Sequence, residues 1–377
     1  KLRVWYRRNS RGKGMRRFVL LVALSLSLSV MSACGDDSAD SNAEVTGSEE
    51  QQRADVPTGA EGGEPEEVSA SSASDDTSPG EASRDEAQDE APRSNPDEAQ
   101  PEATWPEPTY GLSTQLVWHA GITREYLLFV PDSYTGEEAF PLLLNFHGGS
   151  GDATSQQWIS DMRELSDSEG FLLAYPQGEQ LEAGSTHWNP IPPSAESKSS
   201  TDDFGFVAAL IDQMVEDYNV DEGRVYATGY SNGAGMSYGL LCYVSDRIAA
   251  AAPVSGSMYV QMSEECEAAQ PKAVAIFNGT EDFERPYEGL EGWFLPVETA
   301  LDYWLNHNGI DGAPLVETFD AQGFTMERRL YTGGGANVAL YKAIGGGHDW
   351  FDVDIEGANL DRIIWDFLSA HDIEGIR

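Results

Sequence analysis

The feature that most constrains the fold of this chain is a serine between two glycines, in the segment Gly229-Tyr230-Ser231-Asn232-Gly233. It follows the β-branched and aromatic run 224–228 and leads into small residues that suit a helix. In a G-x-S-x-G elbow the serine occupies a strained turn between a strand and a helix, and only glycine fits on either side of it. A tight turn with a serine N-cap is the alternative. The segment therefore predicts a nucleophile elbow with Ser231 as the nucleophile.

A glycine-rich loop upstream supplies a second part of such a site. The apolar run 140–146 has the length of a strand and ends in His147-Gly148-Gly149. Backbone N–H groups in such a loop can be fixed toward an oxyanion before reaction, and each donor lowers a barrier by about 3 kcal/mol. We expect the two donors to be the N–H groups of Gly149 and Asn232, with His147 bracing the loop. An ordinary connecting loop is the alternative.

Two further strand ends carry an acid and a histidine. Asp282 follows the apolar run 272–277, with Glu281 beside it as the rival, and His348 follows a strand candidate and three glycines. The order Ser231, Asp282, His348 is that of α/β-hydrolases. In a triad of this kind the serine attacks a carbonyl, the histidine takes and returns its proton, and the aspartate holds the imidazole. His119, His307 and His371 are expected to be surface or packing residues.

Apolar runs of strand length alternate with helical patterns along residues 109–377. This predicts an α/β fold of the α/β-hydrolase type, with a mostly parallel central sheet, helices on both faces and the first two strands antiparallel at one edge. Strands are expected near 115–119, 126–130, 142–146, 171–175, 225–229, 249–254, 273–278 and 338–344. Helices are expected near 155–167, 203–218, 232–242, 298–307 and 359–371. The site would lie beyond the carboxyl ends of the strands.

The first 34 residues resemble an export signal. They carry eight Lys or Arg and no acid, and Met15 precedes two arginines and an apolar stretch. The stretch ends in Met31-Ser32-Ala33-Cys34, which resembles a lipobox and makes Cys34 the expected lipidation site, with Met15 as the true start. The alternatives are a plain secretory signal and, because the stretch is short for a membrane span, less favourably a transmembrane anchor. The expected destination is the cell surface or outer membrane as a lipoprotein, or secretion.

Residues 35–108 hold 22 acids against three arginines and almost no large apolar residue. Such a segment cannot bury a core, so we expect a disordered acidic linker that acts as a tether. The remaining catalytic domain, 109–377, has 42 acidic and 12 basic residues, a net charge of −30. This charge disfavours nucleic acid and anionic membrane as partners, and leaves contact with a membrane only through a lipid anchor.

The cysteines and one acidic segment indicate whether the chain forms a disulfide bond and whether it binds a metal. With Cys34 assigned to lipid, Cys242 and Cys266 remain as a pair that is expected to form a disulfide in an oxidising compartment, two free thiols being the alternative. The segment 352–357 begins like a calcium loop, but Ile363 stands where such a loop needs glutamate. We therefore expect no metal and no cofactor.

Residues 110–377, which carry these motifs, resemble the secreted polyhydroxybutyrate depolymerase and feruloyl esterase group, the family 1 carbohydrate esterases. The resemblance rests on the segments LNFHGG (144–149), YPQG (175–178), WN (188–189), DDFGF (202–206), RVYATGYSNG (224–233), NGTED (278–282) and GGGHDW (345–350). It implies a serine carboxylester hydrolase that works through an acyl-enzyme. It also implies that the family's triad corresponds to Ser231, Asp282 and His348. The family's oxyanion donors would correspond to Gly149 and Asn232, and its paired cysteines to Cys242 and Cys266.

The resemblance indicates the substrate less sharply. The expected esters are feruloyl or acetyl esters of plant polysaccharide, or poly- or oligo(3-hydroxybutyrate), free or polymeric. Relatives often have His-Gly-Cys where this chain has His147-Gly148-Gly149, and many depolymerases add a polymer-binding domain. Tyr230, Trp188 and Trp350 are expected to bind substrate, packing of the loops being the alternative. A peptidase of the same fold and a non-catalytic surface-binding lipoprotein are the competing functions.

Overall fold

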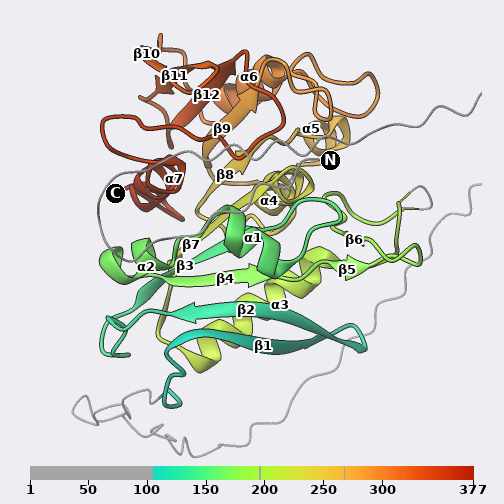
Figure 1. Ribbon diagram of the computed structural model, residues 1–377, viewed down its shortest axis with the longest axis vertical. Helices are drawn as coiled ribbons and strands as arrows, with labels where there is room; N and C mark the ends of the chain where they lie inside the picture. The colour runs from blue at the N-terminus through green and yellow to red at the C-terminus, as the bar shows by residue number, and fades with distance from the viewer. Residues whose placement is uncertain (1–104, 195–196, 267) are drawn as a thin grey trace, which may run out of the picture. The chain divides into compact units, whose positions relative to one another are not determined.

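The computed structural model describes residues 105–194, 197–266 and 268–377 (Figure 1). The strands are β1 (Gly111–His119), β2 (Ile122–Val130), β3 (Phe140–Phe146), β4 (Leu172–Pro176), β5 (Glu179–Gln180), β6 (Thr186–His187), β7 (Val220–Tyr230), β8 (Ala250–Val254), β9 (Ala273–Gly279), β10 (Leu315–Asp320), β11 (Thr325–Tyr331), β12 (Val338–Ile344), β13 (His371–Asp372) and β14 (Gly375–Ile376). The helices are α1 (Ala153–Ile159), α2 (Arg163–Glu169), α3 (Asp203–Asp217), α4 (Asn232–Tyr243), α5 (Val260–Glu265), α6 (Val297–His307) and α7 (Leu360–Ser369).

Ten strands form one sheet in the order β1-β2-β4-β3-β7-β8-β9-β12-β11-β10. The six central strands, from β4 to β12, pair in parallel, and an antiparallel hairpin closes each edge. The α/β-hydrolase prediction is thereby confirmed, including the antiparallel first two strands. The hairpin of β10 and β11 at the other edge was not predicted, because its strands are half exposed and rich in charged residues.

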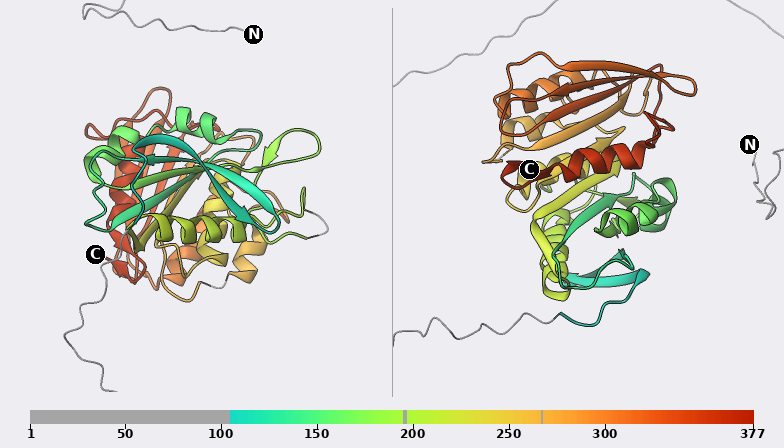
Figure 2. Two further views of the ribbon diagram at one scale, coloured as in Figure 1. Left: turned by 90° about the horizontal axis from the view of Figure 1, so that it is seen from below. Right: turned by 90° about the vertical axis from the view of Figure 1, so that its left-hand side faces the viewer.

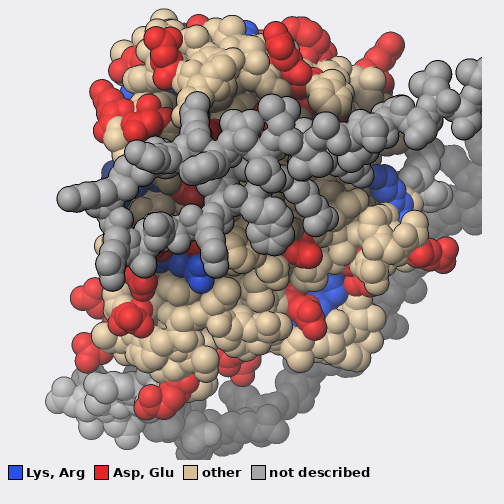
Figure 3. Space-filling view, viewed as in Figure 1, with Lys and Arg blue, Asp and Glu red and all other residues tan. Residues whose placement is uncertain are grey.

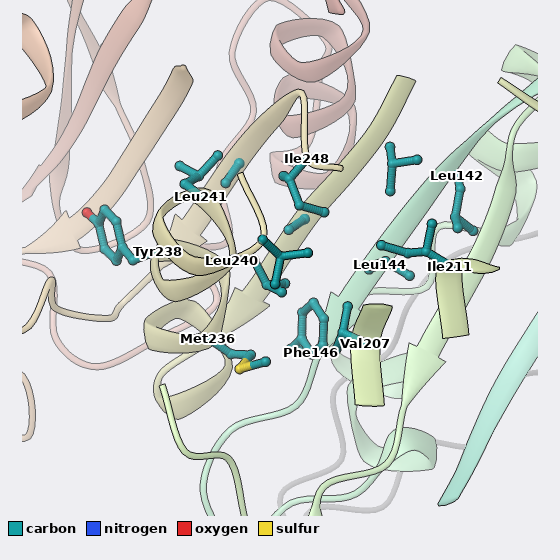
Figure 4. Close-up of a cluster of buried hydrophobic side chains, with 14 of the residues drawn as sticks. Leu142, Leu144, Phe146, Val207, Ile211, Met236, Tyr238, Leu240, Leu241 and Ile248 are labelled. Carbon is teal, nitrogen blue, oxygen red and sulfur yellow. The ribbon is translucent and has the colours of Figure 1, made fainter. Parts of the chain in front are cut away.

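Helices cover both faces of the sheet, as two buried clusters and Figure 2 show. Strand β3 illustrates why: Leu142, Leu144 and Phe146 point to the face packed by α3, α4 and α6, whereas Leu143 points to the face packed by α1, α2 and α7. Successive side chains of a strand point to opposite faces, so a continuous apolar run requires cover on both sides. The first of these clusters is drawn in Figure 4.

The predicted helix over 155–167 was wrong, since the structure has two short helices there. Helix α1 begins with a capping box in which the Asp152 carboxylate accepts the N–H of Ser155. It ends at Ser160, whose hydroxyl donates to the carboxylate of Asp361 and accepts from the Asn145 amide. Because these hydrogen bonds hold Ser160 to distant residues, the chain leaves the helix there and α2 begins separately. The C-terminal helix is also shorter than predicted, because His371 pairs with β14 instead.

The predicted signal, the lipidation site Cys34 and most of the acidic linker lie outside the described residues. The described chain begins at Trp105, whose indole N–H lies 3.4 Å from the carbonyl of Val215 in α3. None of the helices in the described part is long and apolar enough to cross a membrane. No cluster of three or more potential metal ligands occurs within the described ranges.

The predicted disulfide is confirmed: Cys242 near the end of α4 is bonded to Cys266 at the end of α5. The bond closes a segment with a sequence separation of 24 residues. Cross-linking removes conformational freedom from the unfolded chain, and a loop of this length corresponds to about 3 kcal/mol.

Replacing both cysteines with alanine should therefore lower the free energy of unfolding by about 3 kcal/mol. Urea denaturation followed by circular dichroism measures this directly. Reduction of the unaltered protein should shift its midpoint by a similar amount and serves as the control. Equal midpoints for the oxidised protein and the double variant would contradict the prediction.

Candidate active site

Ser231 occupies a strained position between β7 and α4. Its backbone has φ 56° and ψ −111°, outside the regions that a serine usually adopts. Both flanking positions require glycine, because neighbouring backbone atoms leave no room for a Cβ atom. A Cβ atom on Gly229 would lie 2.7 Å from the Phe146 carbonyl oxygen, and one on Gly233 would overlap the carbonyls of Phe146 and His147. The elbow is thus seated against the end of β3, where the glycine-rich loop begins.

The structure brings the three predicted catalytic residues into one hydrogen-bonded line. His348 Nε2 lies 2.9 Å from Ser231 Oγ, and His348 Nδ1 lies 2.7 Å from Asp282 Oδ2. The other carboxylate oxygen of Asp282 accepts the backbone N–H groups of Glu284 and Arg285, each at 2.8 Å. The Asp282 side chain is fully buried, and that of His348 is 7% exposed. The rival Glu281 is exposed on the same loop.

The two predicted oxyanion donors lie beside the serine. A Cβ atom on Gly149 would lie 3.7 Å from Asn232 Cβ, so the loop after β3 and the first residue of α4 are in contact. Neither backbone N–H donates to another residue in the described part of the chain. The first N–H groups of a helix have no partner within the helix, which leaves that of Asn232 free for an anion.

His147 braces the loop, as the sequence suggested. Its Nδ1 lies 2.8 Å from the Gly148 carbonyl and its Nε2 accepts the N–H of Gly178 at 2.9 Å. These partners require the tautomer protonated on Nδ1. Burial lowers the pKa of His147, so the ring is neutral near pH 7.

Trp188 corrects the sequence prediction, because its side chain is fully buried and does not line the surface of the site. Its indole N–H donates to the His147 carbonyl at 3.0 Å. The side chain of Asn232 binds the backbone of Trp188 on both sides, with its oxygen 2.8 Å from the nitrogen and its nitrogen 3.1 Å from the oxygen. Trp188 therefore holds the glycine-rich loop 147–149 against α4.

Tyr230 and Trp350 flank the histidine loop. The Tyr230 hydroxyl donates to the His348 carbonyl at 2.8 Å, and the two rings lie 5.0 Å apart. Burial raises the pKa of Tyr230 to about 12, so it remains a neutral donor. The Trp350 indole N–H donates to Asp361 Oδ1 at 3.1 Å, which directs that side chain toward α7. Both side chains are partly exposed, so contact with substrate remains a prediction for them.

Two residues beside the site were not predicted. Glu284 Oε2 lies 3.7 Å from His348 Nε2, on a side chain that is 55% exposed. Arg285 follows it and lies with its guanidinium carbon 5.0 Å from the centre of the Phe294 ring. No sequence pattern marks either residue. Both lie beside the site because their backbone N–H groups bind the Asp282 carboxylate in a turn.

Sequence similarity identifies the family. The profile of the esterase PHB depolymerase family matches residues 124–270. The putative esterase NocK of Nocardia uniformis subsp. tsuyamanensis is 30% identical over 254 residues, which cover 61% of this chain and 72% of that protein. The chain belongs to the esterase PHB depolymerase family. The family resemblance read from the motifs is confirmed.

Two further relatives are longer proteins. Feruloyl esterase B of Piromyces equi is 30% identical over 255 residues, or 65% of this chain and 45% of that protein. The bifunctional acetylxylan esterase/xylanase XynS20E of Neocallimastix patriciarum is 29% identical over 259 residues, or 68% of this chain and 34% of that protein. The chain thus spans less than half the length of these two relatives. In fold it is similar to the acetyl xylan esterase from Aspergillus awamori, with a TM-score of 0.50, 17% identity and coverage of 68% and 99% of the two chains.

A partly buried polar network connects the loop that holds His348 to β3, the strand before the loop 147–149. Asp361 Oδ1 accepts from both Trp350 Nε1 and the Ser160 hydroxyl, the latter at 2.8 Å. Ser160 in turn accepts from the side chain of Asn145, two residues before His147. Burial raises the pKa of Asp361 to about 6, and Asp161 adds to the rise.

This network predicts a pH-dependent stability. Because the folded protein holds the Asp361 proton more tightly than the unfolded chain, the free energy of unfolding should fall as pH rises from about 4 to about 6. Asp361→Asn keeps the oxygen that accepts both bonds and removes the buried charge. It should be more stable than the unaltered protein at pH 8 by about 1–3 kcal/mol, and equal to it near pH 4.

Urea denaturation at both pH values measures the difference. Asp352→Asn is the matched control, because Asp352 is exposed and lies on the same surface depression, and it should be neutral at both. A destabilised Asp361→Asn at pH 8 would show that the carboxylate is needed in its charged form.

Proposed function

We propose that this protein is a serine carboxylester hydrolase that works through an acyl-enzyme. The observation that carries the proposal is the hydrogen-bonded line from Asp282 through His348 to Ser231. The N–H groups of Gly149 and Asn232, which have no partner among the described residues, lie on the segments beside it. A nucleophile, a base, an orienting carboxylate and two preorganised donors are the groups that acyl transfer requires.

In this mechanism Ser231 Oγ attacks the ester carbonyl while its proton passes to His348 Nε2. The carbonyl oxygen becomes an oxyanion held by the two N–H groups. When the intermediate collapses, the bond to the alcohol breaks and His348 returns the proton to the leaving oxygen. Water then attacks the acyl-enzyme by the same route, which releases the carboxylic acid and restores Ser231.

For the substrate we propose esters of the kind named in the relatives, feruloyl or acetyl groups on plant polysaccharide, with hydroxybutyrate esters as the second class. Support comes from the feruloyl esterase and acetylxylan esterase names among the similar proteins and from the family profile. The proposed steps use the side chains of Ser231, His348 and Asp282 and the N–H groups of Gly149 and Asn232.

Ser231→Ala should lower kcat about 10⁴-fold or more, because the nucleophile is lost while the oxyanion donors remain. His348→Ala and Asp282→Asn should be severely impaired as well. Hydrolysis of 4-nitrophenyl esters measures the rates, and a phosphonate that labels active serines should attach only to the peptide with Ser231. Ser168→Ala, an exposed serine on α2, is the control and should match the unaltered protein. Normal turnover by Ser231→Ala would overturn the triad assignment.

A substrate panel separates the competing functions. The panel consists of methyl ferulate, acetylated xylan, polyhydroxybutyrate and a peptide amide. These substrates differ in the acyl and leaving groups that they offer to the active site. We expect turnover of ferulate or acetyl esters and none of the amide. Amide cleavage would indicate a peptidase, and no turnover of any substrate would favour a binding protein.

We also propose export with a lipid anchor on Cys34, supported by the basic start, the apolar stretch and the lipobox-like segment. Mass spectrometry of the protein purified from membranes should find acyl chains on Cys34. The same protein with Cys34→Ala should leave the membrane fraction. A free amino terminus beyond Cys34 in the soluble fraction would favour a plain secretory signal.

A further inference from the structure

Acidic side chains are abundant on the surface of the folded domain, which has 42 acidic and 12 basic residues between positions 109 and 377. On the face drawn in Figure 3 the acids are spread over many elements, while the basic side chains form only small spots. Exposure of an acid therefore indicates nothing by itself in this protein. What distinguishes Glu284 is the atom that its carboxylate faces.

Glu284 faces the nitrogen that acts as the base in the proposed mechanism. Its Oε2 lies 3.7 Å from His348 Nε2, and the same nitrogen lies 2.9 Å from Ser231 Oγ. Asp282 binds the other nitrogen of the ring, with its Oδ2 2.7 Å from Nδ1. The imidazole thus has a carboxylate at each of its two nitrogens, and the second carboxylate lies beside the atom that receives the proton.

No Lys or Arg in the described part of the chain forms an ion pair with the Glu284 carboxylate. The neighbouring Arg285 donates instead to the backbone carbonyl of Glu284 at 3.1 Å, and its guanidinium packs on the Phe294 ring. The side chain of Glu284 is 55% exposed, whereas that of His348 is 7% exposed. The negative charge of Glu284 therefore acts on the histidine without a cation that would cancel it.

The turn that carries Glu284 is anchored to the rest of the site. Its backbone N–H and that of Arg285 both donate to Asp282 Oδ1 at 2.8 Å. Three residues further along, the Tyr287 hydroxyl donates to Glu298 Oε1 at 2.8 Å, which holds the chain after the turn to the start of α6. The backbone of Glu284 is therefore fixed by the same carboxylate that orients the imidazole.

The contact between Glu284 and His348 becomes attractive only during the reaction. In the resting enzyme Asp282 accepts the proton on Nδ1, so Nε2 presents a lone pair and gains nothing from a carboxylate beside it. When Ser231 Oγ gives its proton to Nε2, the ring becomes an imidazolium whose new N–H lies next to Glu284. A negative charge at this place stabilises the charged ring and not the neutral one, so it lowers the barrier without tightening substrate binding.

From this geometry we infer that Glu284 is a second catalytic carboxylate, which stabilises the imidazolium of His348 from the side of Nε2. The inference rests on the proposed function and adds a residue to its mechanism. Glu284 takes up no proton. The proton moves from Ser231 to His348 and then to the leaving oxygen, and in the second half of the reaction from water to His348 and back to Ser231.

Glu284→Gln tests this role, because it keeps the size of the side chain and the backbone hydrogen bonds and removes the charge. It should lower kcat for 4-nitrophenyl acetate about threefold to fivefold and leave KM unchanged, since both halves of the reaction protonate Nε2. Glu284→Asp keeps the charge and should give an intermediate kcat. Added salt should lower kcat of the unaltered protein toward that of Glu284→Gln, and should change the variant itself little.

Glu281→Gln is the matched control, because Glu281 is an exposed acid on the same loop and has no ion pair with His348 in the described ranges. It should keep the kcat of the unaltered protein. An unchanged kcat in Glu284→Gln, a loss that persists undiminished at high salt, or an equal loss in Glu281→Gln would each overturn the role of Glu284 and leave the triad standing. Absence of turnover by the unaltered protein would overturn the proposed function, and this role with it.

Discussion

The contact on which the site depends is the seating of Gly233 against the carbonyl oxygens of Phe146 and His147. No side chain fits between the start of α4 and the end of β3, so the two parallel strands β3 and β7 must deliver their loops to the same point. This close approach sets Ser231 in its strained turn and brings Gly149 against Asn232. Strain of this kind persists only where the surrounding structure over-determines it, and here the central sheet does so.

Polar contacts then fix the two loops that the sheet brings close to Ser231, the loop 147–149 and the loop that holds His348. Trp188 binds the carbonyl of His147 and is itself held by the amide of Asn232, which connects the oxyanion loop to the nucleophile helix. Asp361 likewise connects the loop that holds His348 to β3. It accepts hydrogen bonds from Trp350 in that loop and from Ser160, which binds Asn145 of β3. Each of these groups would be costly to bury without its partner, so the loops have one satisfied arrangement.

The sequence predicted the parts of the site that local rules determine. Ser231, Asp282 and His348 each lie in the loop or turn after a strand, so strand ends and chain order were enough to bring them together. Other features depend on contacts between distant segments: α1 and α2 separate because Ser160 binds Asn145 and Asp361, and Trp188 turned out to be a buried brace because Phe146, His147 and Phe206 surround it. Glu284 and Arg285 reach the site through a turn that no residue pattern marks.

The parallel order of the sheet also governs when a chain can become reactive. Ser231 follows β7 and Asp282 follows β9, whereas His348, which lies 117 residues after the serine, arrives only with β12, the strand that pairs beside β9. In the proposed mechanism the serine therefore has no base until that last central strand docks, and its hydroxyl is as inert as any other. A partly made or still unfolded chain would then be inactive, because the proposed triad is complete only when the sheet is.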